Sequence, residues 1–246
     1  MGGVKRFGLV VVGAIAAVLL TGAGSASATL LCTSPPVEEE KVLMCPEKSA
    51  YGVDLIPEQE ITGGLFTGAA FESTGGPAGT VTCWESVFVA GIKSEGGSEP
   101  GEGIMSTTFS SGGGNECEST LNAPANPKVT VTAENLSYDG TSVVYEEVGP
   151  PQGKMTVAKA GGAVQIKMNV RAKTPYTCIY KLQAKEELTG KWENTTVGSP
   201  PSKLTFTKVK FELSSGAACP TKMAFSAVYI LRPTFFELGN IYLAKS

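Results

Sequence analysis

The chain has 246 residues and a formal net charge of −3, with no histidine and only two aspartates, Asp54 and Asp139. Without histidine, neither a Ser-His-Asp or Cys-His catalytic system nor a His-ligated zinc or iron site can be built. Two isolated aspartates also exclude an Asp-x-Asp calcium loop. We therefore expect no metal and no cofactor.

Residues 1–28 have the pattern of a signal peptide. Lys5 and Arg6 precede an uncharged apolar run from Gly8 to Leu20, and Ala26-Ser27-Ala28 supplies the small residues that a signal peptidase recognises. The apolar run is shorter than the ~20 residues of a membrane-spanning helix. We expect cleavage after Ala28 and a secreted or cell-envelope protein without a membrane span. An uncleaved N-terminal anchor is the alternative.

Cleavage would remove Lys5 and Arg6 but no acidic residue, so 18 basic and 23 acidic residues would remain, for a net charge of −5. Nucleic acids and anionic membrane surfaces both attract clustered lysine and arginine. We therefore expect neither as a partner. A cell-wall glycan or another extracellular protein fits the charge better.

Six cysteines lie in the predicted mature chain. An even number of cysteines in an exported protein indicates a disulfide framework, and no Cys-x-x-Cys spacing points to a metal site. Residues 82–117 and 177–219 are similar, since each reads Thr-Cys, a strand-like run, a polar loop, a second strand-like run, Ser-Ser-Gly and a closing Cys. We therefore predict nearest-neighbour pairing, with the last two pairs in comparable places of the fold. The predicted disulfides are Cys32–Cys45, Cys83–Cys117 and Cys178–Cys219.

In chain order, Thr29 to Glu47 predicts an arm closed by the first disulfide. Pro57-Glu58-Gln59-Glu60 favours one short helical turn, which Gly63-Gly64 would end. Thr80 to Ala90 predicts a strand with apolar residues on both faces and therefore covered on both sides. Glu85 shares a face with Cys83 in this pattern, which predicts partial burial of its carboxyl group.

Ala123 to Pro127 contains two prolines and is the best candidate boundary in the chain. It would separate an N-terminal half, residues 29–122, from a C-terminal half, residues 123–246; one continuous domain over residues 29–246 is the alternative. Lys128 to Glu134 then alternates cleanly between apolar and polar residues, which predicts a half-buried strand. Tyr138-Asp139-Gly140 predicts a turn.

Residues 154–171 predict a hairpin that turns at Gly161-Gly162 and whose second arm buries Val164, Ile166, Met168 and Val170. From Leu204 to Leu213 the apolar residues change parity. A strand cannot change faces without an inserted residue, so we predict a β-bulge at Thr207-Lys208. Together these segments predict an all-β fold: antiparallel sandwich or barrel-like sheets of about ten to twelve short strands, three disulfides and little helix.

Several strings are similar to uncharacterised exported β-rich, cysteine-containing proteins of actinobacteria. They are Phe109-Ser110 with Cys117, Cys178-Ile179-Tyr180, Cys219-Pro220 and Phe225-Ser226-Ala227-Val228-Tyr229. The resemblance implies a bacterial cell-envelope or extracellular location and no particular activity.

For function, we expect a non-catalytic cell-envelope or extracellular binding or structural protein, and we assign no catalytic residue. Trp192 is the candidate binding residue, as an aromatic platform, with simple strand packing as its alternative; Trp84 is predicted to pack on the disulfide beside it. A carbohydrate-binding module, or a histidine-independent glycoside hydrolase with paired glutamates, is the alternative function. The glutamates considered are Glu85, Glu134, Glu146, Glu147 and Glu193.

Overall fold

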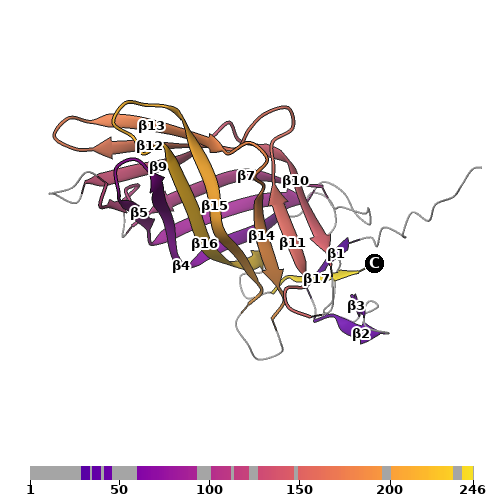
Figure 1. The fold of residues 1–246 in the computed structure, drawn as a ribbon. Helices are drawn as coiled ribbons and strands as arrows, with labels where there is room; N and C mark the ends of the chain where they lie inside the picture. Colours follow the sequence, from indigo (N-terminus) through magenta and orange to yellow (C-terminus); the bar gives the residue numbers. More distant parts are fainter. Residues whose placement is uncertain are drawn as a thin grey trace, which may run out of the picture.

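The computed structural model describes residues 29–33, 35–39, 42–45, 60–92, 101–111, 114–121, 127–146, 149–195, 201–234 and 240–245. They form a large barrel-like sheet and a second, small sheet (Figure 1). None of them forms a helix long and apolar enough to cross a membrane. The predicted signal peptide, residues 1–28, lies outside the described residues. The strands are β1 (Thr29–Cys32), β2 (Val37–Glu39), β3 (Val42–Met44), β4 (Glu60–Gly75), β5 (Thr80–Cys83), β6 (Glu85–Ile92), β7 (Gly101–Ser110), β8 (Glu118–Ser119), β9 (Lys128–Glu134), β10 (Tyr138–Tyr145), β11 (Gly153–Val157), β12 (Gln165–Arg171), β13 (Tyr176–Leu182), β14 (Leu188–Glu193), β15 (Lys203–Ser215), β16 (Lys222–Pro233) and β17 (Tyr242–Lys245).

Eight passes of the chain, each antiparallel to the next, build the large sheet in sequence order. Kinks divide several passes into two strands, so these are β4, β5–β6, β7–β8, β9–β10, β11–β12, β13–β14, β15 and β16. β16 pairs with both β15 and β4, which returns the sheet to its first strand. The all-β class is therefore confirmed. The seventeen strands exceed the predicted number because kinks split long passes.

The loosest seam of the barrel lies between its third and fourth passes. β7 pairs with β10 from Ile104 and Tyr138 onwards, and Cys117 forms an isolated bridge with Val129. Between these two places the described residues of the two passes show no ladder pairing. The barrel is therefore nearly, rather than completely, closed.

The hairpin predicted for residues 154–171 is wrong. β11 pairs with β10 and β14, and β12 pairs with β9 and β13, so the two strands lie end to end in one pass. Gly161-Gly162 lies in the kink between them. The predicted faces are nevertheless confirmed, because the side chains on the inward positions of β12 and just before it are buried: Val164, Ile166, Met168 and Val170.

Two further local predictions are wrong because the core uses the residues concerned: that Gly63-Gly64 would end a helical turn, and that Tyr138-Asp139-Gly140 would form a turn. Glu60 begins β4, so Gly63 and Gly64 lie within a strand and do not end a helix. Gly63 lies under the ring of Phe88, where a Cβ atom would clash. Pro57 to Gln59 lie outside the described residues. Tyr138 begins a strand, since its ring is buried and its hydroxyl donates to the carbonyl of Glu134 at 2.9 Å.

The β-bulge predicted at Thr207-Lys208 is confirmed. Pairing between β15 and β16 changes register between Phe206 and Val209, and Lys208 has a φ of 49°. The amide of Lys208 donates to the Ser226 hydroxyl at 3.0 Å, which satisfies a group that the ladder leaves unpaired. The bulge allows Phe206 and Val209 to be buried on the same side of the strand.

One hydrophobic core fills the barrel and includes Leu31 and Leu243 of the small sheet. Aromatic rings form much of it, with Phe71 and Phe225 at 4.9 Å and Phe88 and Tyr229 at 5.1 Å between ring centroids. The predicted boundary at Ala123 to Pro127 falls mostly on undescribed residues 122–126. The strands on both sides of it belong to one sheet and contribute to this one core.

The two ends of the barrel are held differently. At one end lies the small sheet, in the order β1-β17-β3-β2, with the disulfide Cys32–Cys45 (Figure 1). Asn194 joins it to the barrel, donating from Nδ2 to the Leu243 carbonyl at 2.7 Å and accepting from the Leu243 amide at 2.7 Å.

The opposite end carries the other two disulfides. Cys83–Cys117 joins the start of the second pass to the stretch after β7, and Cys178–Cys219 joins the start of the sixth pass to the loop after β15. All three predicted pairings are confirmed, and the last two occupy comparable places. Three disulfides also indicate a non-reducing environment.

Candidate functional site

Trp192, the binding residue suggested by the sequence, lies in the core. Its side chain is fully buried, and its Nε1 donates to Asn194 Oδ1 at 3.2 Å. It lies between Gly153 of β11 and Leu204 of β15 in the strand register, facing into the barrel. A platform for a surface ligand is therefore excluded at this position, and the strand-packing alternative is correct.

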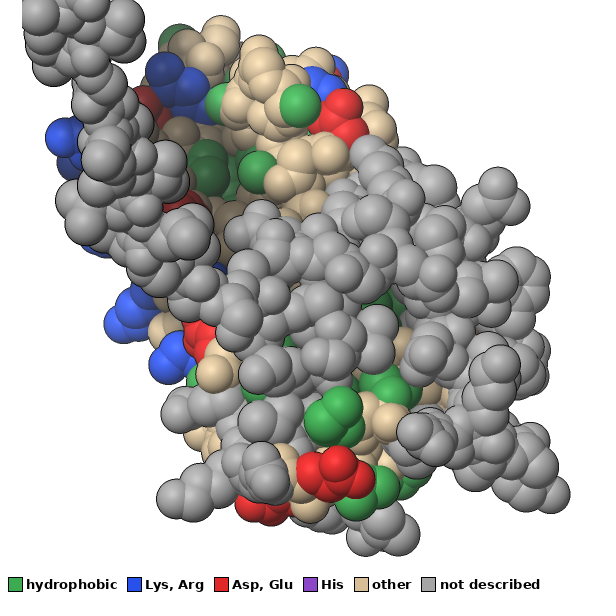
Figure 2. All heavy atoms as spheres, turned by 90° about the vertical axis from the view of Figure 1, so that its right-hand side faces the viewer, with side chains coloured by type: hydrophobic (Ala, Val, Ile, Leu, Met, Phe, Trp, Pro, Cys, Tyr) green, Lys and Arg blue, Asp and Glu red, His purple; other side chains and the backbone are tan. Residues whose placement is uncertain are grey.

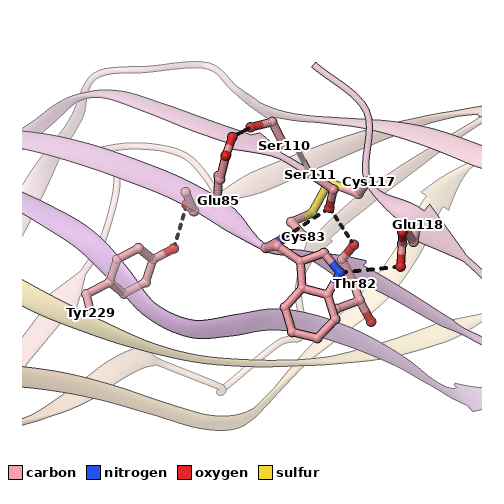
Figure 3. Close-up of a disulfide and its surroundings, with 10 residues drawn as sticks. Thr82, Cys83, Glu85, Ser110, Ser111, Cys117, Glu118 and Tyr229 are labelled. Carbon is pink, nitrogen blue, oxygen red and sulfur yellow. Dashed lines mark hydrogen bonds between the residues drawn. A yellow bond between two sulfur atoms is a disulfide. The ribbon is translucent and has the colours of Figure 1, made fainter. Parts of the chain in front are cut away.

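The candidate glutamates are dispersed. Glu134 is 3.9 Å from Lys167, Glu146 is 2.9 Å from Lys154, Glu193 ends β14, and Glu147 lies outside the described residues. Glu85 is exposed and accepts a hydrogen bond from Ser110 Oγ at 2.8 Å (Figure 3). No two of the four that are described line one of the hollows discussed below.

The burial predicted for Glu85 is wrong because the strand bends at the residue before it. Val81 and Cys83 are buried, Trp84 and Glu85 are both exposed, and burial resumes at Ser86. The bend thus reverses the inside-outside alternation between β5 and β6. Trp84 itself continues the outward positions of β5, opposite Val81 and Cys83; it is 59% exposed and does not pack into the core. The prediction that this strand is covered on both sides is also wrong.

Although it is exposed, the Trp84 side chain is held in one place. Its Nε1 donates to Glu118 Oε2 at 3.3 Å, and its six-membered ring lies over Gly68, 3.1 Å from where a Cβ atom would stand. Its backbone amide donates to Ser111 Oγ at 3.1 Å. A flat apolar ring is thereby fixed against the barrel wall.

The surroundings of Trp84 are equally constrained. Ser111 donates from its hydroxyl to the Thr82 carbonyl at 3.3 Å, and Cys83, the residue before Trp84, is joined to Cys117 by a disulfide (Figure 3). A ligand that stacks on this ring would therefore not have to order it first, which reduces the entropy cost of binding.

A polar groove adjoins Trp84 on the outer wall. It has a volume of about 440 Å³ and includes Glu118, which accepts the hydrogen bond of the indole, and Thr82, which lies over Gly68 beside the indole. Hydroxyl groups dominate its lining, with one carboxylate and one ammonium group. The lining residues are Thr80, Thr82, Glu118, Ser119, Thr120 and Lys128.

A second hollow lies further along β4. It has a volume of about 560 Å³ and is lined by Gly64, Phe66 and Ile230 among others. No atom lies within 4 Å of the position that a Cβ of Gly64 would take, so the missing side chain creates the space. Phe66 is 55% exposed, with Lys203 Nζ at 5.1 Å from its ring centroid.

Inside the barrel, an apolar cavity of about 60 Å³ lies among Phe88, Tyr138, Met155 and Tyr229. A cavity of about 150 Å³ is needed to hold benzene, so this one is a packing void. Burial raises the pKa of Tyr229 to about 12 although its hydroxyl is hydrogen-bonded to Ser86, and raises that of Tyr138 to about 12. Both phenols are therefore neutral structural groups.

The rest of the described surface offers no comparable candidate for a binding site. Viewed from the side of the small sheet, hydrophobic and acidic side chains form small separate groups, with Lys and Arg gathered along the left edge (Figure 2). Within the described ranges, no group of three or more Cys, Asp or Glu residues has the geometry to hold a metal ion. The wall around Trp84 is thus the candidate site. No family model, no curated protein and no solved structure matches the chain.

Proposed function

We propose that the protein is a non-catalytic binding protein of the bacterial cell exterior or cell envelope, and that it binds through the outer wall around Trp84. The observation that carries this proposal is a large aromatic ring that is 59% exposed yet fixed by Glu118 and Gly68. Exposed aromatic side chains of this kind mark binding surfaces, since they bury much area at little entropy cost.

The location rests on independent observations. The predicted signal peptide ends at Ala28, and the three disulfides suit an oxidising compartment. The resemblance to exported actinobacterial proteins supports a bacterial envelope as the setting. The barrel acts as a rigid support, because the binding residue is borne by strands and by a disulfide.

The test is a sedimentation assay with insoluble bacterial cell walls and the oxidised protein of residues 29–246. We expect the wild type to sediment with the walls and Trp84→Ala to lose at least about thirtyfold in affinity, as for a central contact residue. Val37→Ala is the matched control, because Val37 is an exposed hydrophobic residue of the small sheet, 49% accessible. Equal binding by wild type and Trp84→Ala, with unchanged melting temperatures, would refute the proposal.

A further inference from the structure

Phe66 and Trp84 lie on the same outer face of β4. The pairing of β4 with β16 changes register twice between Leu65 and Ala70, so this stretch is irregular, but exposure still places its residues: Phe66 is 55% exposed and lines the second hollow together with Gly64. Trp84 covers Gly68 from the neighbouring pass, while Gly64 leaves the hollow described above. Along β4 this face therefore presents the hollow at Gly64, then the exposed ring of Phe66, then the exposed ring of Trp84 beside the polar groove.

We infer that the ligand is a polysaccharide chain, which stacks one sugar on Trp84 and continues across Phe66 into the hollow at Gly64. This inference rests on the proposed function and names the ligand class of the same site. Phe66 and Gly68 are two residues apart, so their Cα atoms are separated by at most about 7 Å. Successive units of one extended chain can therefore contact both rings.

The chemistry of the wall favours sugar over protein. A pyranose ring has apolar faces of C–H groups that stack on a flat aromatic ring, and a rim of hydroxyls that need hydrogen-bond partners. Thr80, Thr82 and Thr120 supply hydroxyls beside Trp84. Glu118 and Lys128 add one acceptor and one set of donors of opposite charge, so this groove has no net charge and complements a neutral polyol.

The hollow at the other end also offers hydroxyl groups and apolar walls, and Arg232 adds a guanidinium group to its lining. Thr62 and Thr234 present hydroxyl groups there, hydrogen-bonded to each other at 2.9 Å. Ile230 and Phe66 form apolar walls. A protein partner would instead be expected to meet a broad apolar centre with charged residues confined to its rim.

The ligand class is tested on the cell walls used above, after their sugars or their proteins have been destroyed. We expect periodate oxidation of the walls to abolish binding and protease treatment of the walls to leave it unchanged. The reverse result would overturn the polysaccharide inference while leaving a binding function. Failure to bind untreated walls would instead count against the proposed function itself.

The path of the chain is tested by Gly64→Val, which fills the hollow. The position has room for a side chain and lies in a strand, so the melting temperature should not fall. We expect affinity for untreated walls to drop about tenfold, the effect of losing one good contact. Gly149→Val is the control, since Gly149 also has no atom within 4 Å of its Cβ position. Binding by Gly64→Val at the wild-type level would overturn the extension into the hollow.

Discussion

The two disulfide segments occupy comparable places but use their aromatic residues in opposite ways. Trp84 directly follows Cys83 on the outward side and faces water, and the bend then leaves Glu85 exposed as well; after Cys178 the alternation continues, so that Tyr180, two residues on, is 1% exposed. Each segment also contains one tryptophan, Trp84 on the wall and Trp192 in the core. The difference teaches that the position of an aromatic residue in the strand alternation, rather than composition, decides whether its ring is available to a ligand.

The largest expected difference is between the two tryptophans. Trp192→Ala should lower the free energy of unfolding by about 3–5 kcal/mol, as for a large core residue replaced by alanine. Trp84→Ala should lower it by about 1 kcal/mol, because one face of its ring already contacts solvent. Urea unfolding of both variants measures this. Equal losses would contradict the contrast between wall and core.

Removal of Cys83–Cys117 and removal of Cys178–Cys219 should lower stability equally but should differ in their effect on binding. They close stretches of similar length, with sequence separations of 34 and 41 residues. Replacing either pair by alanine should therefore cost about 4 kcal/mol. Only Cys83→Ala with Cys117→Ala should also weaken cell-wall binding, since Cys83 is the residue before Trp84. A similar loss of binding in a folded Cys178→Ala, Cys219→Ala protein would show that the wall is not the site.

Alkaline pH should reveal the buried Tyr229 of β16, whose hydroxyl is hydrogen-bonded to Ser86 of the first segment. The pKa of Tyr229 is raised to about 12, above the value of about 10 in an unfolded chain. The stability that its neutral form contributes is complete below pH ~10 and is lost as pH rises through about 12, by roughly 2–3 kcal/mol. Between pH 9 and 12 the urea midpoint of the wild type should approach that of Tyr229→Phe and then fall below it; parallel curves would contradict the raised pKa.

The smallest effect should have the opposite sign. The Tyr180 hydroxyl is buried and has no hydrogen-bond partner among the described residues. Tyr180→Phe should therefore raise the free energy of unfolding by about 1 kcal/mol, because an unsatisfied buried polar group is removed. Tyr229→Phe at neutral pH is the matched control and should lower it by about 1 kcal/mol, since it leaves the Ser86 hydroxyl unpaired. A loss of stability in Tyr180→Phe would indicate a partner such as a buried water.

The sequence by itself determined the features that depend on local periodicity and on chain chemistry. The all-β class, the faces of β9 and β12, the bulge at Lys208 and the three disulfides all follow from alternation, parity and cysteine spacing. These signals are short-range, because a strand with one buried face must repeat every two residues.

Only the tertiary structure decided which strands pair and which aromatic residue is exposed. The local pattern of Gly63 indicates the end of a helix. Its glycine is required instead because the ring of Phe88, from another strand, occupies the place of a side chain. Gly161-Gly162 looked like a hairpin turn, but β11 and β12 each find better partners in neighbouring passes. Ser111, Cys117 and Glu118, which contact the bend at Trp84, come from another pass, so no local pattern could predict that Glu85 turns outward or that the indole is fixed over Gly68.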